Sequence, residues 1–165
     1  MNKNLVILCY HGVSKINKNQ GIENFSGKHI PLKTFKKQIN YLKNKKCEFL
    51  SLDEITKNIE NKIPFKKNSI GITFDDGFKN NFDVAVPILK KNKIPATFFL
   101  CPKNIDKQEI FWVDKIEGCV NKTKKKQIKL NLNKKKIFDI KTYKQKINCI
   151  KSIKAFCKNN KSNIK

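Results

Sequence analysis

Three short apolar runs, separated by segments with helical spacing, restrict the folds that this chain can adopt. Leu5–Tyr10 is apolar at every position, and Ser69–Phe74 and Ala96–Cys101 are nearly so. Such runs are typical of strands covered on both faces, and we expect the first and last to be buried. Strands that alternate with helices predict an α/β fold with parallel strands.

The segments between these runs divide into loops, helices and one more strand. Residues 14–28 are polar and predict a loop, whereas residues 47–51 fit a short strand. Pro31 opens a helical pattern, since apolar residues recur at spacings of three and four: Leu32, Phe35, Ile39 and Leu42. Asp53 is expected to cap a short second helix or to lie in its first turn.

A third helix is predicted over residues 80–92. Its apolar face would contain Phe82, Val86 and Leu89. Pro87 is expected to weaken or kink this helix, because proline cannot donate a backbone hydrogen bond.

Two adjacent carboxylates, Asp75 and Asp76, end the Ser69–Phe74 run and precede Gly77. Glycine allows a sharp turn here, so both carboxylates can reach one pocket at the mouth of the sheet. Like charges at close range raise each other's pKa, and a metal ion or a proton-transfer role would explain the pair. His11 ends the first strand, and the carboxyl ends of parallel strands collect ligand groups. We therefore expect His11 to lie near the two carboxylates, whereas His29 is expected to be a loop residue without a catalytic role.

The formal net charge of +24 comes from lysine alone, since the chain has 37 lysines and no arginine. Proteins that bind nucleic acids use arginine for base edges and for paired phosphate contacts, so its absence disfavours that class. We interpret most of the lysines as a hydrated surface, although the charge would still attract anionic partners.

Cysteine usage and hydropathy give weaker indications of location. The six cysteines include no Cys-x-x-Cys pair, and Cys9 and Cys101 are expected to be buried free thiols. No apolar run approaches the roughly 20 residues of a membrane span, and the N-terminus lacks a signal-peptide pattern. These features predict a cytoplasmic protein without a membrane span.

Beyond Gly118 the sequence becomes rich in lysine. Apolar residues recur every three positions near the end: Ile147, Ile150, Ile153 and Phe156. This spacing predicts an amphipathic helix over about 141–158 with a core-facing stripe.

Four sequence elements occur in an order that resembles the polysaccharide deacetylase family, the NodB-homology domain of carbohydrate esterases. They are Cys9-Tyr-His-Gly-Val13, Thr73-Phe-Asp-Asp-Gly77, Pro95-Ala-Thr-Phe-Phe-Leu100 and Ile110-Phe-Trp-Val-Asp114. The resemblance implies a distorted (β/α) barrel and a hydrolase that removes N-acetyl, or sometimes O-acetyl, groups from a polysaccharide or glycan precursor. An acetylated amino-sugar glycan is the implied substrate.

The same resemblance implies a role for each of the two aspartates. Asp75 would be the catalytic base, and Asp76 would bind a divalent metal, commonly zinc. From its place at the end of the first strand, His11 is expected at the active-site mouth, where it would bind substrate or metal. In the family, a His-Ser/Thr-x-x-His motif supplies two more metal ligands, and it is missing from this chain. The metal site is therefore expected to be incomplete.

This departure leads us to interpret the chain as the N-terminal part of a deacetylase, truncated and inactive alone. Residues 1–117 would form the first half of the family's domain, and residues 118–165 a lysine-rich helical segment, inserted before the missing second half. One alternative is a non-catalytic carbohydrate-binding or regulatory remnant of the same fold. Another, ranked lower, is a basic nucleic-acid-binding module.

Overall fold

The computed structural model describes residues 4–15, 24–107 and 109–160 of the chain. They form two compact units, the first made of residues 4–15 and 27–105 and the second of residues 24–26, 106–107 and 109–160. The units divide between residues 105 and 106. The predicted end of the family's half-domain at residue 117 concerns the family domain and stays a prediction. In these described ranges, no helix combines the length and the apolar character that crossing a membrane requires.

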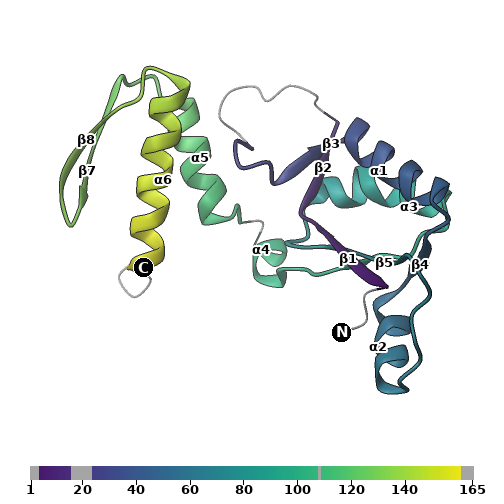
Figure 1. The fold of residues 1–165 in the computed structure, drawn as a ribbon. Helices are drawn as coiled ribbons and strands as arrows, with labels where there is room; N and C mark the ends of the chain where they lie inside the picture. The colour runs from purple at the N-terminus through teal and green to yellow at the C-terminus, as the bar shows by residue number, and fades with distance from the viewer. Residues whose placement is uncertain (1–3, 16–23, 108, 161–165) are drawn as a thin grey trace. The chain divides into compact units, whose positions relative to one another are not determined.

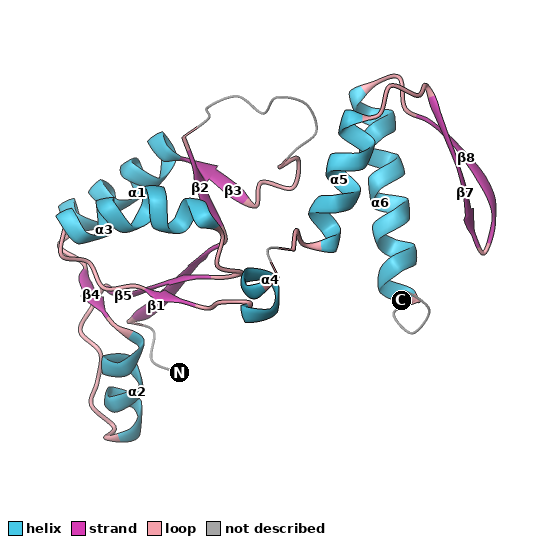
Figure 2. Cartoon of the chain, turned by 180° about the vertical axis from the view of Figure 1, so that it is seen from behind, coloured by secondary structure: helices cyan, strands magenta, loops and turns pink. Residues whose placement is uncertain are grey.

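The elements follow one another along the chain as Figures 1 and 2 show. The strands are β1 (Leu5–Tyr10), β2 (Gly12–Ser14), β3 (His29–Pro31), β4 (Glu48–Leu50), β5 (Ser69–Phe74), β6 (Thr97–Phe98), β7 (Gln127–Leu132) and β8 (Lys134–Asp139). The helices are α1 (Leu32–Asn44), α2 (Leu52–Glu60), the π-helical turn η1 (Asn81–Ala85), α3 (Val86–Lys91), α4 (Pro102–Asp106), α5 (Trp112–Lys122) and α6 (Tyr143–Asn159).

A parallel sheet organises the first unit, which confirms the predicted α/β class. β5 pairs with β1 along its whole length, with β4 at its start and with β6 at its end. The pairing of Leu5 with Ser69 and of Tyr10 with Phe74 brings the ends of β1 and β5 together. A second, smaller parallel pair, β2 with β3, flanks the predicted loop over residues 14–28. Residues 16–23 of that loop lie outside the described residues, and residues 24–28 form neither helix nor strand, as predicted.

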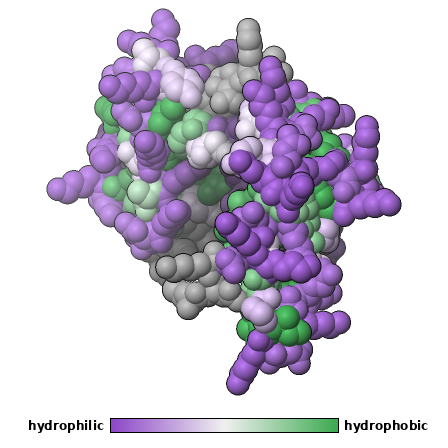
Figure 3. Space-filling model, turned by 45° about the vertical axis from the view of Figure 1, so that its right-hand side comes forward, coloured by the Kyte–Doolittle hydropathy of each residue, from purple (hydrophilic) through white to green (hydrophobic). Residues whose placement is uncertain are grey.

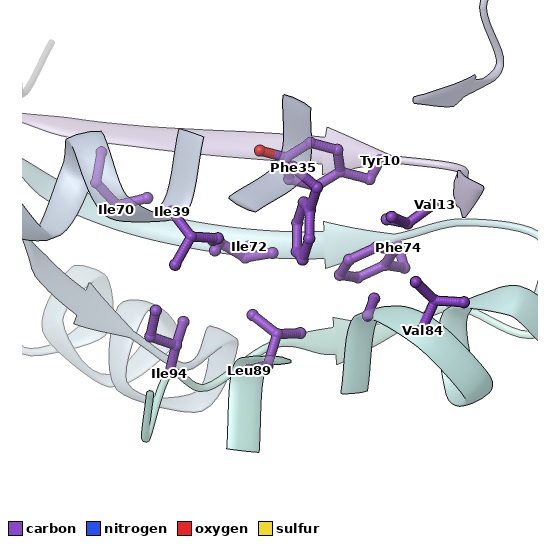
Figure 4. Packing of buried hydrophobic residues seen from close by; sticks show 11 residues of the cluster. Tyr10, Val13, Phe35, Ile39, Ile70, Ile72, Phe74, Val84, Leu89 and Ile94 are labelled. Carbon is purple, nitrogen blue, oxygen red and sulfur yellow. The ribbon is translucent and has the colours of Figure 1, made fainter. Parts of the chain in front are cut away.

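One face of this sheet packs against α1 and α3 and forms the main core (Figures 1 and 4). The side chains on this face alternate along the strands, so β5 contributes Ile70, Ile72 and Phe74. The ring of Phe74 stacks on Phe98 at 4.8 Å and on Tyr10 at 5.3 Å between centroids. The predicted helix after Pro31 is confirmed as α1, and its Phe35 and Ile39 enter this core.

The opposite face of the sheet is only partly covered, so the prediction that β1 is buried was wrong. α2 covers part of it, and the space beside Gly71 is filled by Ile55 of α2 and by Ile7 of β1. Ile7 remains 48% exposed and Cys9 is also exposed. β1 lies at the end of the strand order, so it has a sheet neighbour on one side among the described strands.

Two other predictions in this unit need correction. β6 covers only Thr97–Phe98, and Phe99 and Leu100 are exposed, so 96–101 is not a long buried strand. The helix predicted over residues 80–92 begins as the wider turn η1, just before Pro87 in α3. Because a π-helical turn contains more residues than an α-helical turn, a different set of side chains faces the core. Phe82 is 74% exposed, whereas Val84 and Leu89 are buried.

The second unit pairs two helices with a β-hairpin. α5 and α6 pack side by side, and the predicted stripe on α6 faces the core through Ile147, Ile150 and Ile153. The expectation of a helical segment throughout was wrong over residues 127–139, which form the antiparallel pair β7–β8. Apolar residues alternate with polar ones along 127–132, and Asn133 adopts a φ of 59° between the strands, so the local sequence favours a hairpin.

A buried ion pair holds the helices of this unit together. Lys154 of α6 donates a hydrogen bond to Glu117 of α5, and both side chains are largely buried. Most of the other lysines lie at the surface, where hydrophilic residues surround small hydrophobic patches (Figure 3). Their exposure supports the interpretation of the lysines as a hydrated surface.

Replacing Thr142 with alanine is expected to destabilise the second unit by about 1 kcal/mol, because it removes an N-terminal cap. The Thr142 hydroxyl accepts from the backbone of Gln145, whose side chain accepts from the backbone of Thr142. Urea unfolding followed by circular dichroism would measure the change. Thr142→Ser keeps the hydroxyl, and an equal loss in that variant would contradict the capping argument.

Candidate active site

The two aspartates lie directly after β5, at the carboxyl-terminal edge of the sheet. The backbone N–H of Asp75 donates to the carbonyl oxygen of Tyr10 at 2.9 Å, so the contact between β1 and β5 continues one residue beyond β5. Both carboxylates are partly exposed. The two aspartates thus lie at the predicted edge of the sheet, where parallel sheets present ligand groups.

The chain turns sharply at the second aspartate. Asp76 has a φ of 70° and Gly77 a φ of 69°, two consecutive residues in the left-handed region. Glycine adopts this conformation without steric cost, whereas a Cβ at position 77 would lie 2.9 Å from the tip of the Leu100 side chain and displace it. A non-glycine residue held in this conformation is uncommon, and Asp76 is of the type that tolerates it best.

His11 follows β1 directly, beside the end of β5. The Asn81 side chain donates to the carbonyl oxygen of His11 at 3.0 Å and ties the turn after β1 to the turn after β5. Asn81 is 2% exposed, and its amide oxygen has no hydrogen-bond partner among the described residues. Tyr10 pairs with Phe74, so His11 and Asp75 are the next residues on the two neighbouring strands, and this pairing is the basis for their proximity. The role of His11 stays a prediction.

His29, predicted to be a loop residue, starts β3 and contacts the segment that follows the aspartates. Its Nδ1 lies 2.8 Å from Nδ2 of Asn80, and its ring packs edge-on against Phe78. A Cβ at position 12 would lie 2.1 Å from the His29 ring, so Gly12 permits the close approach. No sequence signal connected His29 with this segment, because the contact depends on the β2–β3 pairing.

Cys9 is the site neighbour that sequence analysis missed. Its Sγ donates a hydrogen bond to Oδ2 of Asp75 at 3.3 Å. Desolvation raises the pKa of the Cys9 thiol, a hydrogen bond with Thr73 opposes the rise, and Asp75 and Asp76 add to it. The thiol is therefore protonated at neutral pH and can act as the donor. A sequence signal for this contact exists: when the ends of Leu5–Tyr10 and Ser69–Phe74 are aligned, Cys9 stands opposite Thr73, two residues before Asp75.

The described residues do not by themselves fit a catalytic zinc site. Such a site needs about three protein ligands. Across residues 4–15, 24–107 and 109–160, no group of three histidine, cysteine, aspartate or glutamate side chains could hold a metal ion. Asp76 can therefore supply only part of a ligand set.

Comparison with known proteins agrees with this geometry. A family profile described as polysaccharide deacetylase matches residues 62–144, about half of the chain, including both aspartates and Gly77. The chain belongs to the polysaccharide deacetylase family. The resemblance inferred from the four sequence elements is thus confirmed.

Relatives of this deacetylase-family chain include two staphylococcal enzymes named poly-β-1,6-N-acetyl-D-glucosamine N-deacetylase. The Staphylococcus epidermidis protein is 40% identical over 93 residues, which cover 56% of this chain and 31% of the relative. The Staphylococcus aureus protein is 34% identical over 119 residues, 66% of this chain and 40% of the relative. The chain thus spans roughly a third to two fifths of the length of these relatives.

Solved structures of the same family share the fold. IcaB from Ammonifex degensii is 31% identical with a TM-score of 0.50, over 59% of this chain and 38% of that one. The Streptococcus pyogenes deacetylase PplD, solved in complex with acetate, has a TM-score of 0.54 over 71% of this chain and 52% of that one. At 21% identity, the second likeness concerns the fold alone.

Proposed function

We propose that the protein carrying this chain is a metal-dependent hydrolase that removes N-acetyl groups from a polymer of β-1,6-linked N-acetylglucosamine. The observation that carries the proposal is the pair Asp75–Asp76 in the turn at the carboxyl end of β5. Adjacent like charges disfavour each other's charged form, and a metal ion or a proton-transfer role explains why they are kept together. The names of the staphylococcal relatives support the choice of polymer.

In this proposal Asp75 is the general base. Its carboxylate takes a proton from the water molecule whose oxygen attacks the acetyl carbonyl carbon. That proton passes on to the amide nitrogen as the C–N bond breaks, which releases acetate and a free amine. Partial exposure of Asp75 allows water and substrate to reach it. His11, beside the same edge of the sheet, is proposed to contact the sugar.

Asp76 is proposed to be a ligand of a divalent metal, with zinc the first choice. A bound metal would supply polarisation of the acetyl carbonyl and stabilisation of the charge that develops on its oxygen. The further ligands would have to come from outside the described residues, because those residues hold no group of three ligands. We therefore expect the 165-residue chain alone to be inactive or nearly so.

The sheet of the first unit is proposed to be part of a distorted (β/α) barrel. Parallel strands covered by α1 and α3 on one face support this architecture. In such a barrel the partly covered face, with Ile7, Cys9 and Gly71, would point inward.

The deciding experiment measures acetate release from β-1,6-linked N-acetylglucosamine oligomers by the natural protein that carries this sequence. We expect release in the presence of zinc, loss of release after treatment with a chelator, and recovery when zinc is restored. Saturable binding of the oligomers without acetate release under any of these conditions would contradict the hydrolase proposal. It would support the carbohydrate-binding alternative.

A further inference from the structure

Cys9 occupies a defined place on the partly covered face of the sheet. It pairs with Thr73 across the β1–β5 register, and Asp75 lies two residues beyond Thr73 on β5's path. Residues two apart in a strand point to the same face, so these three side chains gather on one side of the sheet. Their gathering follows from the parallel register and does not depend on a flexible loop.

The contact between Cys9 and Asp75 has a clear direction. The thiol donates to Oδ2 of Asp75, and an ionised carboxylate is an acceptor only. A hydrogen bond to a charged acceptor is stronger than one between neutral groups, which compensates for the weakness of a thiol donor. The bond therefore restricts the rotation of the Asp75 carboxylate.

Restricted rotation matters for Asp75 because a second carboxylate, that of Asp76, lies beside it. Asp75 and Asp76 are adjacent, and their like charges favour conformations in which the two groups turn away from each other. Because the thiol engages Oδ2, the second oxygen of Asp75, Oδ1, remains available to water. A general base must present one oxygen within hydrogen-bond reach of the proton that it takes.

We propose that Cys9 is a positioning residue for Asp75, holding Oδ2 so that Oδ1 accepts the proton during hydrolysis. This inference rests on the proposed function of Asp75 as the general base. Simple packing is the competing explanation, because a small apolar side chain such as valine would fill the same space in a strand. The two explanations differ only in the need for a donor, and conservative substitutions separate them.

The first test measures the contact in the 165-residue chain and needs no activity. The rate of Cys9 alkylation by iodoacetamide is followed by peptide mass spectrometry in the wild type, in Asp75→Asn and in Asp53→Asn. Loss of the Asp75 charge is expected to raise the Cys9 rate several-fold, since an anion beside a thiol disfavours the reactive thiolate. Exposed Cys119 is the internal reference in each sample. An unchanged Cys9 rate in Asp75→Asn would overturn the proposal.

The second test measures acetate release by the active protein carrying Cys9→Val, Cys9→Ser or the matched control Ile7→Val. Loss of the donor in Cys9→Val is expected to lower kcat about tenfold with KM unchanged, as for the loss of a hydrogen bond to a charged group. Cys9→Ser keeps a donor and should recover most of this loss. Ile7→Val lies on the same strand and face without touching Asp75, and it should behave as the wild type.

The outcomes separate this inference from the proposed function. A kcat within twofold of the wild type in Cys9→Val, or an equal loss in Cys9→Ser, would overturn the positioning role while hydrolysis stands. Absence of acetate release by the wild type would overturn the proposed function and the role of Cys9 in the reaction together. Thermal unfolding of each variant checks that the fold is unchanged.

Discussion

Asparagine in place of Asp75 is expected to lower kcat for acetate release by a factor of about 10²–10⁴, the usual contribution of a general base. Asparagine has nearly the same shape as aspartate but cannot take a proton from water. The fold should be retained, because the backbone contact from residue 75 to Tyr10 does not involve the side chain. Acetate release from N-acetylglucosamine oligomers and a thermal unfolding curve would measure both properties on the same preparation.

Asp83→Asn is the matched control for this substitution. Asp83 also follows β5, lies in η1 and forms an exposed ion pair with Lys79 at 3.7 Å. Exposed ion pairs contribute little, so neither activity nor stability should change appreciably. Full turnover by Asp75→Asn would show that another group is the base.

Alanine in place of Phe35 is expected to lower the free energy of unfolding by about 3–5 kcal/mol. The Phe35 side chain is fully buried in α1, packing edge-on against Tyr10 at 5.3 Å and against Phe74 at 6.1 Å between centroids. Figure 4 shows the Phe35 side chain among the other core side chains between the helix and the sheet. Its removal is therefore expected to leave a cavity there. Since domains are stable by about 5–15 kcal/mol, the loss is a large fraction of the total. Urea unfolding of the two proteins measures it.

Tyr41 provides the comparison within the same helix. It is aromatic like Phe35 but 60% exposed, so Tyr41→Ala should change stability by less than about 1 kcal/mol. Equal effects of the two substitutions would mean that α1 does not pack on the sheet through Phe35.

The elements predicted most accurately are those with a strong local signal. β1 and β5 have the predicted bounds because each is a short apolar run that ends at a polar residue or a turn. The helix after Pro31 was also correct, since its apolar spacing matches one face of a helix and proline starts it. Local pattern and tertiary structure agree at these places.

The errors concern features that depend on distant parts of the chain. The exposure of β1 depends on which strands flank it in the sheet, and six apolar residues in a row carry no such information. The η1 turn shifts the buried face by inserting a wider turn before Pro87, so regular helical spacing misplaced Phe82. The β7–β8 hairpin shows alternation that the high lysine content obscured.

The candidate site was predicted in part. The order of the four elements identified the family, and the turn after β5 follows from the local sequence Asp75, Asp76 and Gly77. The roles of the two aspartates stay predictions. The contacts of Cys9 with Asp75 and of Asn80 with His29 join residues far apart in sequence. They require a register that sequence patterns alone do not specify.

The central place of β5 also sets an order of events during synthesis. β1, β4 and β6 all pair with β5, and Leu5 finds its partner only at Ser69. The sheet therefore cannot be completed before residues up to Phe74 have left the ribosome. Until then β1 has no partner strand, and its apolar side chains have no sheet to pack in. At about 5–20 residues per second this delay lasts several seconds. A chaperone that shields the β1 segment during synthesis should therefore raise the yield of folded protein more than one that acts after release.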